Sequence, residues 1–301
     1  MSKLAVMFTV LLITSGTVVP ASTAASSSRK ICLFFDDGWE NHYSVVLPIL
    51  QEFGFKATFG VIVKYIGMNR GTFFSRMNYT ELSFLKQAGM EIACHTMTHT
   101  HLLNVSKEVL DEEIKRAKQV LEAHGFQIET FIYPYGEFND TIQRYVAEAG
   151  YWCARTIERG VFFPSEENRY SLPGWVADTK TMDDFVSFVE SVPPGGVGCI
   201  VYHFISDEGP AETTVPVNLF RKQLEYLKEN NFEIVLVSSL FSAPPAPPPT
   251  IPWSILTLVV ASLFYGIALF LIFRRRTRKR RETTTSGSPV SSSPLSSRYF
   301  S

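Results

Sequence analysis

Short apolar runs alternate with amphipathic stretches along most of the chain. Short apolar runs are typical of buried strands, whereas apolar positions three and four residues apart are typical of helices that pack on one face. The apolar runs predict strands at residues 31–35, 57–63, 91–94, 130–133, 151–156, 197–204 and 232–237. The stretches between them predict helices at residues 43–53, 82–88, 106–124, 141–149, 181–190 and 218–229.

This alternation predicts an α/β protein with a parallel sheet and helices outside it. So many units in one domain favour a (β/α)7–8 barrel over two doubly wound halves. In such barrels the chemistry lies on the loops that follow the carboxyl ends of the strands. Polar residues directly after the predicted strands are therefore the first candidates for a functional site.

The two ends of the chain predict export and a membrane anchor. Residues 1–24 combine an early lysine, an apolar run and a small-residue end, which predicts a signal peptide, with an uncleaved anchor as the alternative. Residues 251–273 carry no charge and are long enough for a transmembrane helix, with a buried core helix as the alternative. Residues 274–301 are basic and then rich in Ser and Thr, and the positive-inside rule predicts that this tail is cytoplasmic.

A proline-rich stretch, residues 243–250, predicts a stalk between this helix and a globular domain at residues 29–242. We therefore expect a single-pass protein of the cell membrane whose globular domain is extracellular.

Charge and composition narrow the function of the main body. Residues 25–250 carry 19 Lys and Arg against 28 Asp and Glu, a formal charge of −9, although the whole chain has only −1. An acidic body argues against a nucleic-acid partner, because phosphate backbones are held by Lys and Arg. The 24 Phe and 12 Tyr are enough for a sizeable core, and four Cys are too few for a disulfide scaffold.

Polar motifs follow four of the predicted strands. They are Asp36-Asp37-Gly38, His95-Thr96-Met97-Thr98-His99, Tyr133-Pro134-Tyr135-Gly136 and His203. Each motif alone is common, as a turn, a surface histidine pair or a hydrogen-bonded histidine. At the rim of one barrel, however, they predict a shared site.

This set of side chains suits a metal site. A catalytic metal site with an open position needs three nitrogen or oxygen donors, which His95, His99 and one carboxylate supply. The second carboxylate is then free to act as a base, and Gly38 permits the tight turn that brings both carboxylates to the rim.

In this order and spacing, the motifs resemble those of the polysaccharide deacetylases, the NodB-homology domains of carbohydrate esterase family four. The resemblance covers about residues 30–241. It implies a distorted barrel and metal-dependent removal of acetyl groups from N-acetylated glycans. It also implies that Asp37, His95 and His99 hold a divalent ion, Zn²⁺ or else Co²⁺ or another divalent metal.

The resemblance implies a catalytic role for three further residues. Asp36 corresponds to the general base, His203 to the general acid, and the backbone N–H of Tyr135 to an oxyanion donor. Hydrolysis of an amide needs all three kinds of group, because the carbonyl resists attack by water and the amine leaves poorly unless it is protonated.

The sequence departs from the family pattern in the third motif. The family often carries an arginine that holds the base two residues before the proline, and this chain has Ile132 there. Arg155, at the end of the next predicted strand, is our candidate substitute. We group it with Trp39 and Trp175 as candidate substrate-binding residues. The two indoles could stack on sugar rings or simply pack in the core or rim.

We therefore expect a hydrolase that removes N-acetyl groups from an N-acetylglucosamine-type polysaccharide or oligosaccharide outside the cell. One alternative is a hydrolase that uses the same site on another amide or ester, such as a cyclic imide or an O-acetyl group. A second is a non-catalytic glycan-binding domain. The complete set of expected ligands, base and acid argues against the second alternative.

Overall fold

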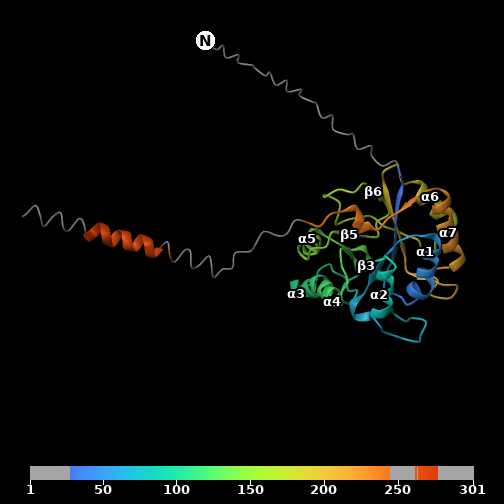
Figure 1. Ribbon diagram of the computed structural model, residues 1–301, viewed down its shortest axis with the longest axis horizontal. Helices are drawn as coiled ribbons and strands as arrows, with labels where there is room; N and C mark the ends of the chain where they lie inside the picture. The colour runs from blue at the N-terminus through green and yellow to red at the C-terminus, as the bar shows by residue number, and fades with distance from the viewer. Residues whose placement is uncertain (1–27, 245–261, 263, 277–301) are drawn as a thin grey trace, which may run out of the picture. The chain divides into compact units, whose positions relative to one another are not determined.

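The computed structural model describes residues 28–244, 262 and 264–276 (Figure 1). The chain forms two units, residues 1–245 and 246–301, of which the first contains a globular domain and the second a helix over residues 264–276. The predicted signal peptide and most of the predicted stalk, membrane helix and tail lie outside the described residues. In the part of the chain that is described, no helix has both the length and the apolar character needed to span a bilayer.

Strands of two to six residues form the centre of the globular domain. They are β1 (Lys30–Phe35), β2 (Thr58–Val61), β3 (Glu91–Cys94), β4 (Thr130–Ile132), β5 (Cys153–Arg155), β6 (Val161–Phe162), β7 (Trp175–Val176), β8 (Val197–Tyr202), β9 (Phe204–Ile205), β10 (Thr214–Val215) and β11 (Glu233–Ile234). Nine of them form one sheet in the order β5-β4-β3-β2-β1-β8-β6, with β11 beside β1 and β7 beside β8. The pairs are parallel except that β6 is antiparallel to β8, and β9 pairs separately with β10.

Helices surround this sheet (Figure 1). They are η1 (His42–Val46), α1 (Leu47–Phe53), η2 (Val63–Tyr65), α2 (Tyr79–Gln87), α3 (Lys107–Leu110), η3 (Asp111–Arg116), α4 (Ala117–Ala123), η4 (Pro134–Gly136), α5 (Asp140–Glu148), α6 (Met182–Glu190), α7 (Val217–Glu229) and η5 (Val237–Leu240). Local sequence explains several of the starts. Asn78 and Thr181 form capping boxes at α2 and α6, and the Ser106 side chain accepts from the first turn of α3.

The α/β class and the parallel sheet predicted from the sequence are confirmed, and the sheet of the predicted distorted (β/α)7–8 barrel is a half-barrel. Between β5 and α6, residues 169–176, for which no strand was predicted, add to the sheet. This segment bonds to β5 through Thr156 N and Leu172 O at 2.8 Å, and to β8 through β7. Proline and glycine interrupt the region at Gly160, Pro164 and Pro173, which explains why β6 and β7 are only two residues long.

Strand β1 sets the position of the site. Its residues 31–35 are fully buried, as expected for a central strand of a parallel sheet that is covered on both faces. Ile31, Leu33 and Phe35 join the larger apolar cluster, whereas Cys32 and Phe34 join a second cluster. Because side chains alternate along a strand, Asp36 continues the Cys32–Phe34 row at the carboxyl end of β1.

Candidate functional site

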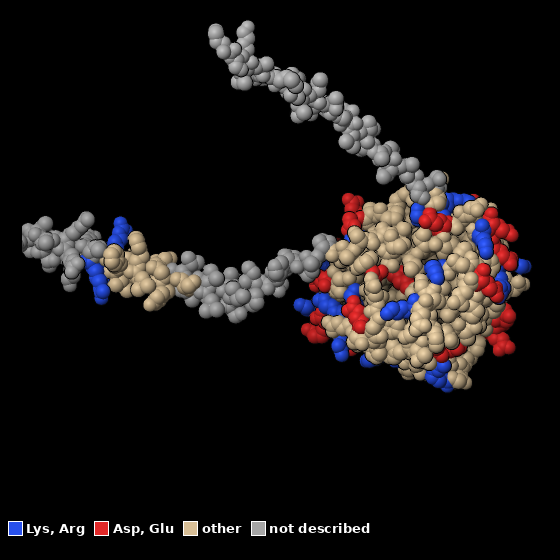
Figure 2. Space-filling view, viewed as in Figure 1, with Lys and Arg blue, Asp and Glu red and all other residues tan. Residues whose placement is uncertain are grey.

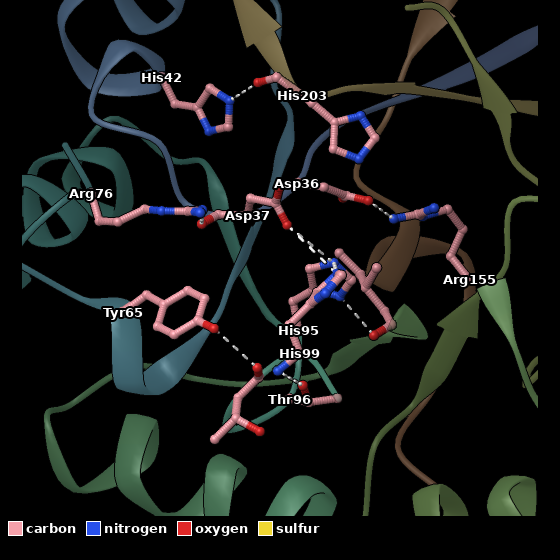
Figure 3. Close-up of polar contacts among 12 residues, drawn as sticks. Asp36, Asp37, His42, Tyr65, Arg76, His95, Thr96, His99, Arg155 and His203 are labelled. Carbon is pink, nitrogen blue, oxygen red and sulfur yellow. Dashed lines mark hydrogen bonds and ion pairs between the residues drawn. The ribbon is translucent and has the colours of Figure 1, made fainter. Parts of the chain in front are cut away.

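The candidate site lies at the carboxyl ends of neighbouring parallel strands. Asp36 follows β1, His95 follows β3, and His203 follows β8. Because β3, β2, β1 and β8 are consecutive in the sheet, these side chains converge from segments far apart in the sequence (Figure 3). In the space-filling view, acidic atoms also appear in a hollow near the middle of the visible face of the globular domain (Figure 2).

Asp37, His95 and His99 form a cluster that could hold a metal ion. One ligand atom from each lies within 4.8 Å of the others. Asp37 Oδ1 is 3.6 Å from His95 Nε2 and 3.7 Å from His99 Nε2, and the two Nε2 atoms are 3.1 Å apart. Two imidazoles and one carboxylate are a donor set that suits Zn²⁺ and similar divalent ions.

The protonation and orientation of the two histidines fit this role. The Nδ1 atom of His95 lies 2.9 Å from the carbonyl oxygen of Ile132, so that an N–H there leaves Nε2 as the lone-pair donor. Burial lowers the pKa of His95 to about 4 and lowers that of His99 as well. Both rings are therefore neutral near pH 7, which is the form that binds a metal ion.

The backbone around these ligands is unusual. Asp37, Thr96 and His99 have φ values of 73°, 66° and 63°, in the left-handed region that residues with a Cβ seldom adopt. The segment from His95 to His99 is thus a tight loop, closed by a 2.9 Å bond from the His99 N–H to Thr96 Oγ1. Such conformations persist only where the surrounding contacts hold them.

Asp36 lies beside the cluster with one oxygen bound and one free. Its Oδ2 is 2.5 Å from Nη2 of Arg155, and its Oδ1 is buried without a hydrogen-bond partner among the described residues. Burial raises the pKa of Asp36, but the charge and hydrogen bond of Arg155 and the charge of His203 outweigh this and lower it overall. The carboxylate is therefore ionised near neutral pH, with Oδ1 available to accept a proton.

The position of Arg155 accounts for the departure in the third motif. Arg155 on β5 pairs in register with Ile132 on β4, so an arginine on the neighbouring strand reaches the aspartate. Its side chain is fully buried between Asp36 and the ring of Phe34, which lies 5.0 Å away. Our grouping of Arg155 among substrate-binding residues is therefore wrong, because a buried guanidinium that binds the base does not reach a substrate.

His203 is held at both its ring and its backbone. Its Nδ1 lies 2.5 Å from Asp178 Oδ2, and its carbonyl oxygen lies 2.5 Å from His42 Nε2. Burial lowers the pKa of His203, but the hydrogen bond and charge of Asp178 overcome this and raise it to about 9. The ring is therefore protonated near neutral pH and can donate a proton.

Sequence reasoning gave Asp178 no role and missed His42. Asp178 lies two residues after β7, and only the pairing of β7 with β8 shows that it faces His203. His42 has no local signature, since a single histidine at the start of a helix is common. Its ring is fully buried against Phe35, with centroids 5.5 Å apart.

The three aromatic candidates differ in exposure. Tyr135 is 48% exposed, and its ring stacks on that of His101 with centroids 3.9 Å apart. Trp39 is half-buried, with the guanidinium of Arg76 at 3.2 Å from its ring centroid and the ring of Phe204 at 4.4 Å. Neighbouring groups thus already pack against its ring, which leaves little of it for a sugar.

The sugar-stacking role considered for Trp175 is wrong. Its side chain is only 4% exposed and stacks on Phe188 of α6, with centroids 4.9 Å apart. The packing alternative holds because β7 lies against β8 inside the domain.

The α/β half-barrel thus has an Asp–His–His cluster that could hold a metal ion at its rim, with a second aspartate beside it. Residues 23–154 match the family model described as polysaccharide deacetylase. This match confirms the resemblance of the chain's motifs to the polysaccharide deacetylases.

Known proteins of this kind match different shares of the chain, from 42% to 73%. A peptidoglycan-N-acetylglucosamine deacetylase of Bacillus cereus is 32% identical over 127 residues, 42% of this chain and 55% of that protein. A chitooligosaccharide deacetylase of Rhizobium leguminosarum bv. trifolii is 28% identical over 159 residues, 52% of this chain and 66% of that protein. The chain spans about half the length of the curated relatives it matches, from 32% to 66%.

A solved structure supports the shared fold. A family 4 carbohydrate esterase from Streptomyces lividans, in complex with acetate, has a TM-score of 0.52 and 21% identity. The match covers 74% of this chain and 100% of that one.

Proposed function

We propose that this protein is a metal-dependent deacetylase that hydrolyses N-acetyl groups of an N-acetylglucosamine-type polysaccharide or oligosaccharide. One observation carries the proposal: Asp36, with a buried oxygen that has no hydrogen-bond partner among the described residues, lies beside the Asp37–His95–His99 cluster, and His203, bound to Asp178, lies nearby. The names of the relatives, which refer to peptidoglycan and chitooligosaccharide, support the substrate class.

The residues divide the chemistry among them. A divalent ion held by Asp37, His95 and His99 would polarise the amide carbonyl and acidify a bound water. Asp36 Oδ1 takes the proton from the attacking water, while Arg155 keeps Oδ2 fixed.

The leaving amine needs a proton donor, and the negative charge that develops on the carbonyl oxygen needs a hydrogen-bond donor. His203 gives a proton to the amine nitrogen as its bond to the acetyl carbon breaks, because an unprotonated amine is a poor leaving group. We assign to the Tyr135 backbone N–H the stabilisation of the negative charge that develops on the carbonyl oxygen. Tyr135 has a left-handed conformation, φ 58°, at the turn that follows β4.

We further propose that this chemistry takes place outside the cell, on a protein that the segment 251–273 anchors in the membrane. The apolar and then basic sequence of residues 251–281, and the signal-like residues 1–24, support this proposal.

The substrate class is tested by acetate release from the full-length, zinc-loaded protein. N-acetylglucosamine oligomers are expected to release acetate, and an O-acetylated xylan is expected to release less. Release from the ester alone would favour the alternative hydrolase. A zinc-bound protein that is inactive on every substrate would favour a glycan-binding role.

Replacing Asp178 by Asn is expected to lower the pKa of His203 and to move the alkaline limb of the pH profile downward. In the wild type, kcat/KM should fall as the pH rises through about 9, where His203 loses its proton. The raised pKa also stabilises the fold at pH values below the ordinary histidine pKa of about 6.5, and this stabilisation is lost as the pH rises through 9. The measurements are kcat/KM and the free energy of unfolding from pH 6 to 10.

Asp183→Asn is the matched control, since Asp183 is an exposed carboxylate in the first turn of α6. It should leave both profiles unchanged. An alkaline limb that stays near 9 in Asp178→Asn would show that Asp178 does not set the protonation of His203.

A further inference from the structure

The turn that carries Asp37 is clamped by a segment from another part of the chain. Residues 75–77, just before α2, run antiparallel to this turn, with a bridge between Trp39 and Arg76. The N–H of Met77 donates to Gly38 O at 2.9 Å, and the N–H of Glu40 donates to Ser75 O at 2.9 Å. The Asp37 turn is therefore fixed by contacts outside its own sequence.

Arg76 makes the most specific of these contacts. Its Nη1 donates to the backbone carbonyl oxygen of Asp37 (Figure 3). Its guanidinium carbon lies over Trp39, 3.2 Å from the ring centroid. A second ring, that of Tyr65, lies 5.3 Å from the guanidinium carbon. The planar guanidinium can stack and donate at the same time, which an ammonium group cannot do in this geometry.

The Arg76 side chain binds the backbone of Asp37 and not its carboxylate, and this matters for the Asp37–His95–His99 cluster. Arg76 binds the carbonyl oxygen of Asp37, whereas the Asp37 carboxylate faces His95 and His99 at 3.6 and 3.7 Å. A cation that bound the carboxylate would compete with a metal ion for it. Here the carboxylate oxygens remain available.

Asp37 needs such support because its backbone is left-handed, with φ 73°. A residue with a Cβ leaves this conformation unless its peptide is held. If the peptide relaxed, the carboxylate would turn away from the two imidazoles, since side-chain direction follows the backbone.

We infer that Arg76 is a positioning residue of the metal site, which raises its affinity for a divalent ion by holding the Asp37 peptide without touching the ion. The inference rests on the proposed metal site. Groups that orient metal ligands typically change metal affinity by about 10- to 100-fold when they are removed.

The test is the zinc Kd of the full-length protein, measured by competition with a chromogenic chelator. Arg76→Met is expected to weaken zinc binding by about 10- to 100-fold. Arg76→Lys, which keeps the charge but not the planar fork, is expected to fall between Met and wild type. Lys64→Met is the control, because Lys64 is an exposed cation on the preceding η2 and its loss should leave the Kd unchanged.

The thermal unfolding of the metal-free variants separates positioning from a merely structural role. A lower unfolding temperature with a wild-type zinc Kd, in either folded variant, would overturn the inference. If Arg76→Met does not fold, Arg76→Lys alone decides the matter by the same criterion. A wild-type protein that fails to bind zinc would instead refute the metal site itself, so the two failures can be told apart.

Discussion

Asp36→Asn is expected to reduce kcat on N-acetylglucosamine oligomers by about 10²- to 10⁴-fold, the usual contribution of a general base. An amide oxygen in place of the free Oδ1 cannot take the proton of the attacking water. The three proposed ligands are untouched, so zinc should still bind. Acetate release and zinc content, measured on the same preparation, check both halves of this expectation.

Asp37→Asn is the matched comparison, since it changes the adjacent carboxylate in the same turn. It should lose zinc affinity, because the carboxylate that faces His95 and His99 becomes a neutral amide. If Asp36→Asn loses zinc and Asp37→Asn keeps it, the roles of the two aspartates are reversed. Full activity in Asp36→Asn would rule out Asp36 as the base.

Arg155→Met is expected to have the largest effect on stability. The substitution leaves the Asp36 carboxylate buried without its cation, and breaking a buried ion pair from one side costs roughly 3–5 kcal/mol. The pKa of Asp36 should rise, because burial is then less strongly opposed. Activity should fall, and the acidic limb of kcat/KM should move to higher pH.

The stability difference between wild type and Arg155→Met should itself depend on pH. A lowered aspartate pKa stabilises the fold above its unfolded value of about 3.9 and loses this contribution as the pH falls through the folded value. Denaturant unfolding at pH 7 and near pH 3 measures this. Arg159→Met, an exposed arginine four residues on, is the control.

A second substitution tests whether an arginine on β4 can replace Arg155 on β5 as the partner of Asp36. Ile132 lies opposite Arg155, and its side chain and the free Asp36 oxygen both border Gly60. Adding Ile132→Arg to Arg155→Met should therefore recover part of the activity. No recovery, in a variant whose unfolding temperature has recovered, would argue that Arg155 acts by some means other than its charge on Asp36.

Much of the fold could be predicted because its central strands are continuous apolar runs. The predicted strand at 91–94 coincides with β3, and the helix predicted at 181–190 begins at the Thr181 cap of α6. The convergence of Asp36, His95 and His203 also followed from local sequence, since parallel strands bring their carboxyl ends to one edge.

The features that could not be predicted depend on contacts between distant segments, which local sequence does not specify. Two-residue strands such as β6 have too few residues to show a period, so the half-barrel could not be distinguished from a barrel. The burial of Trp175 follows from its contact with α6, and the contact of Arg76 with Asp37 joins segments 39 residues apart. Such contacts have no local signature.

The most direct test of the account is a crystal of the protein grown with zinc and measured at the zinc absorption edge. We predict an anomalous peak that marks a zinc ion bound by Asp37 and by Nε2 of both His95 and His99. Asp36 should lie beside this ion without binding it. His99→Ala should lose the peak under the same conditions. A wild-type crystal with no peak among these three side chains, or with zinc bound only elsewhere, would contradict the account.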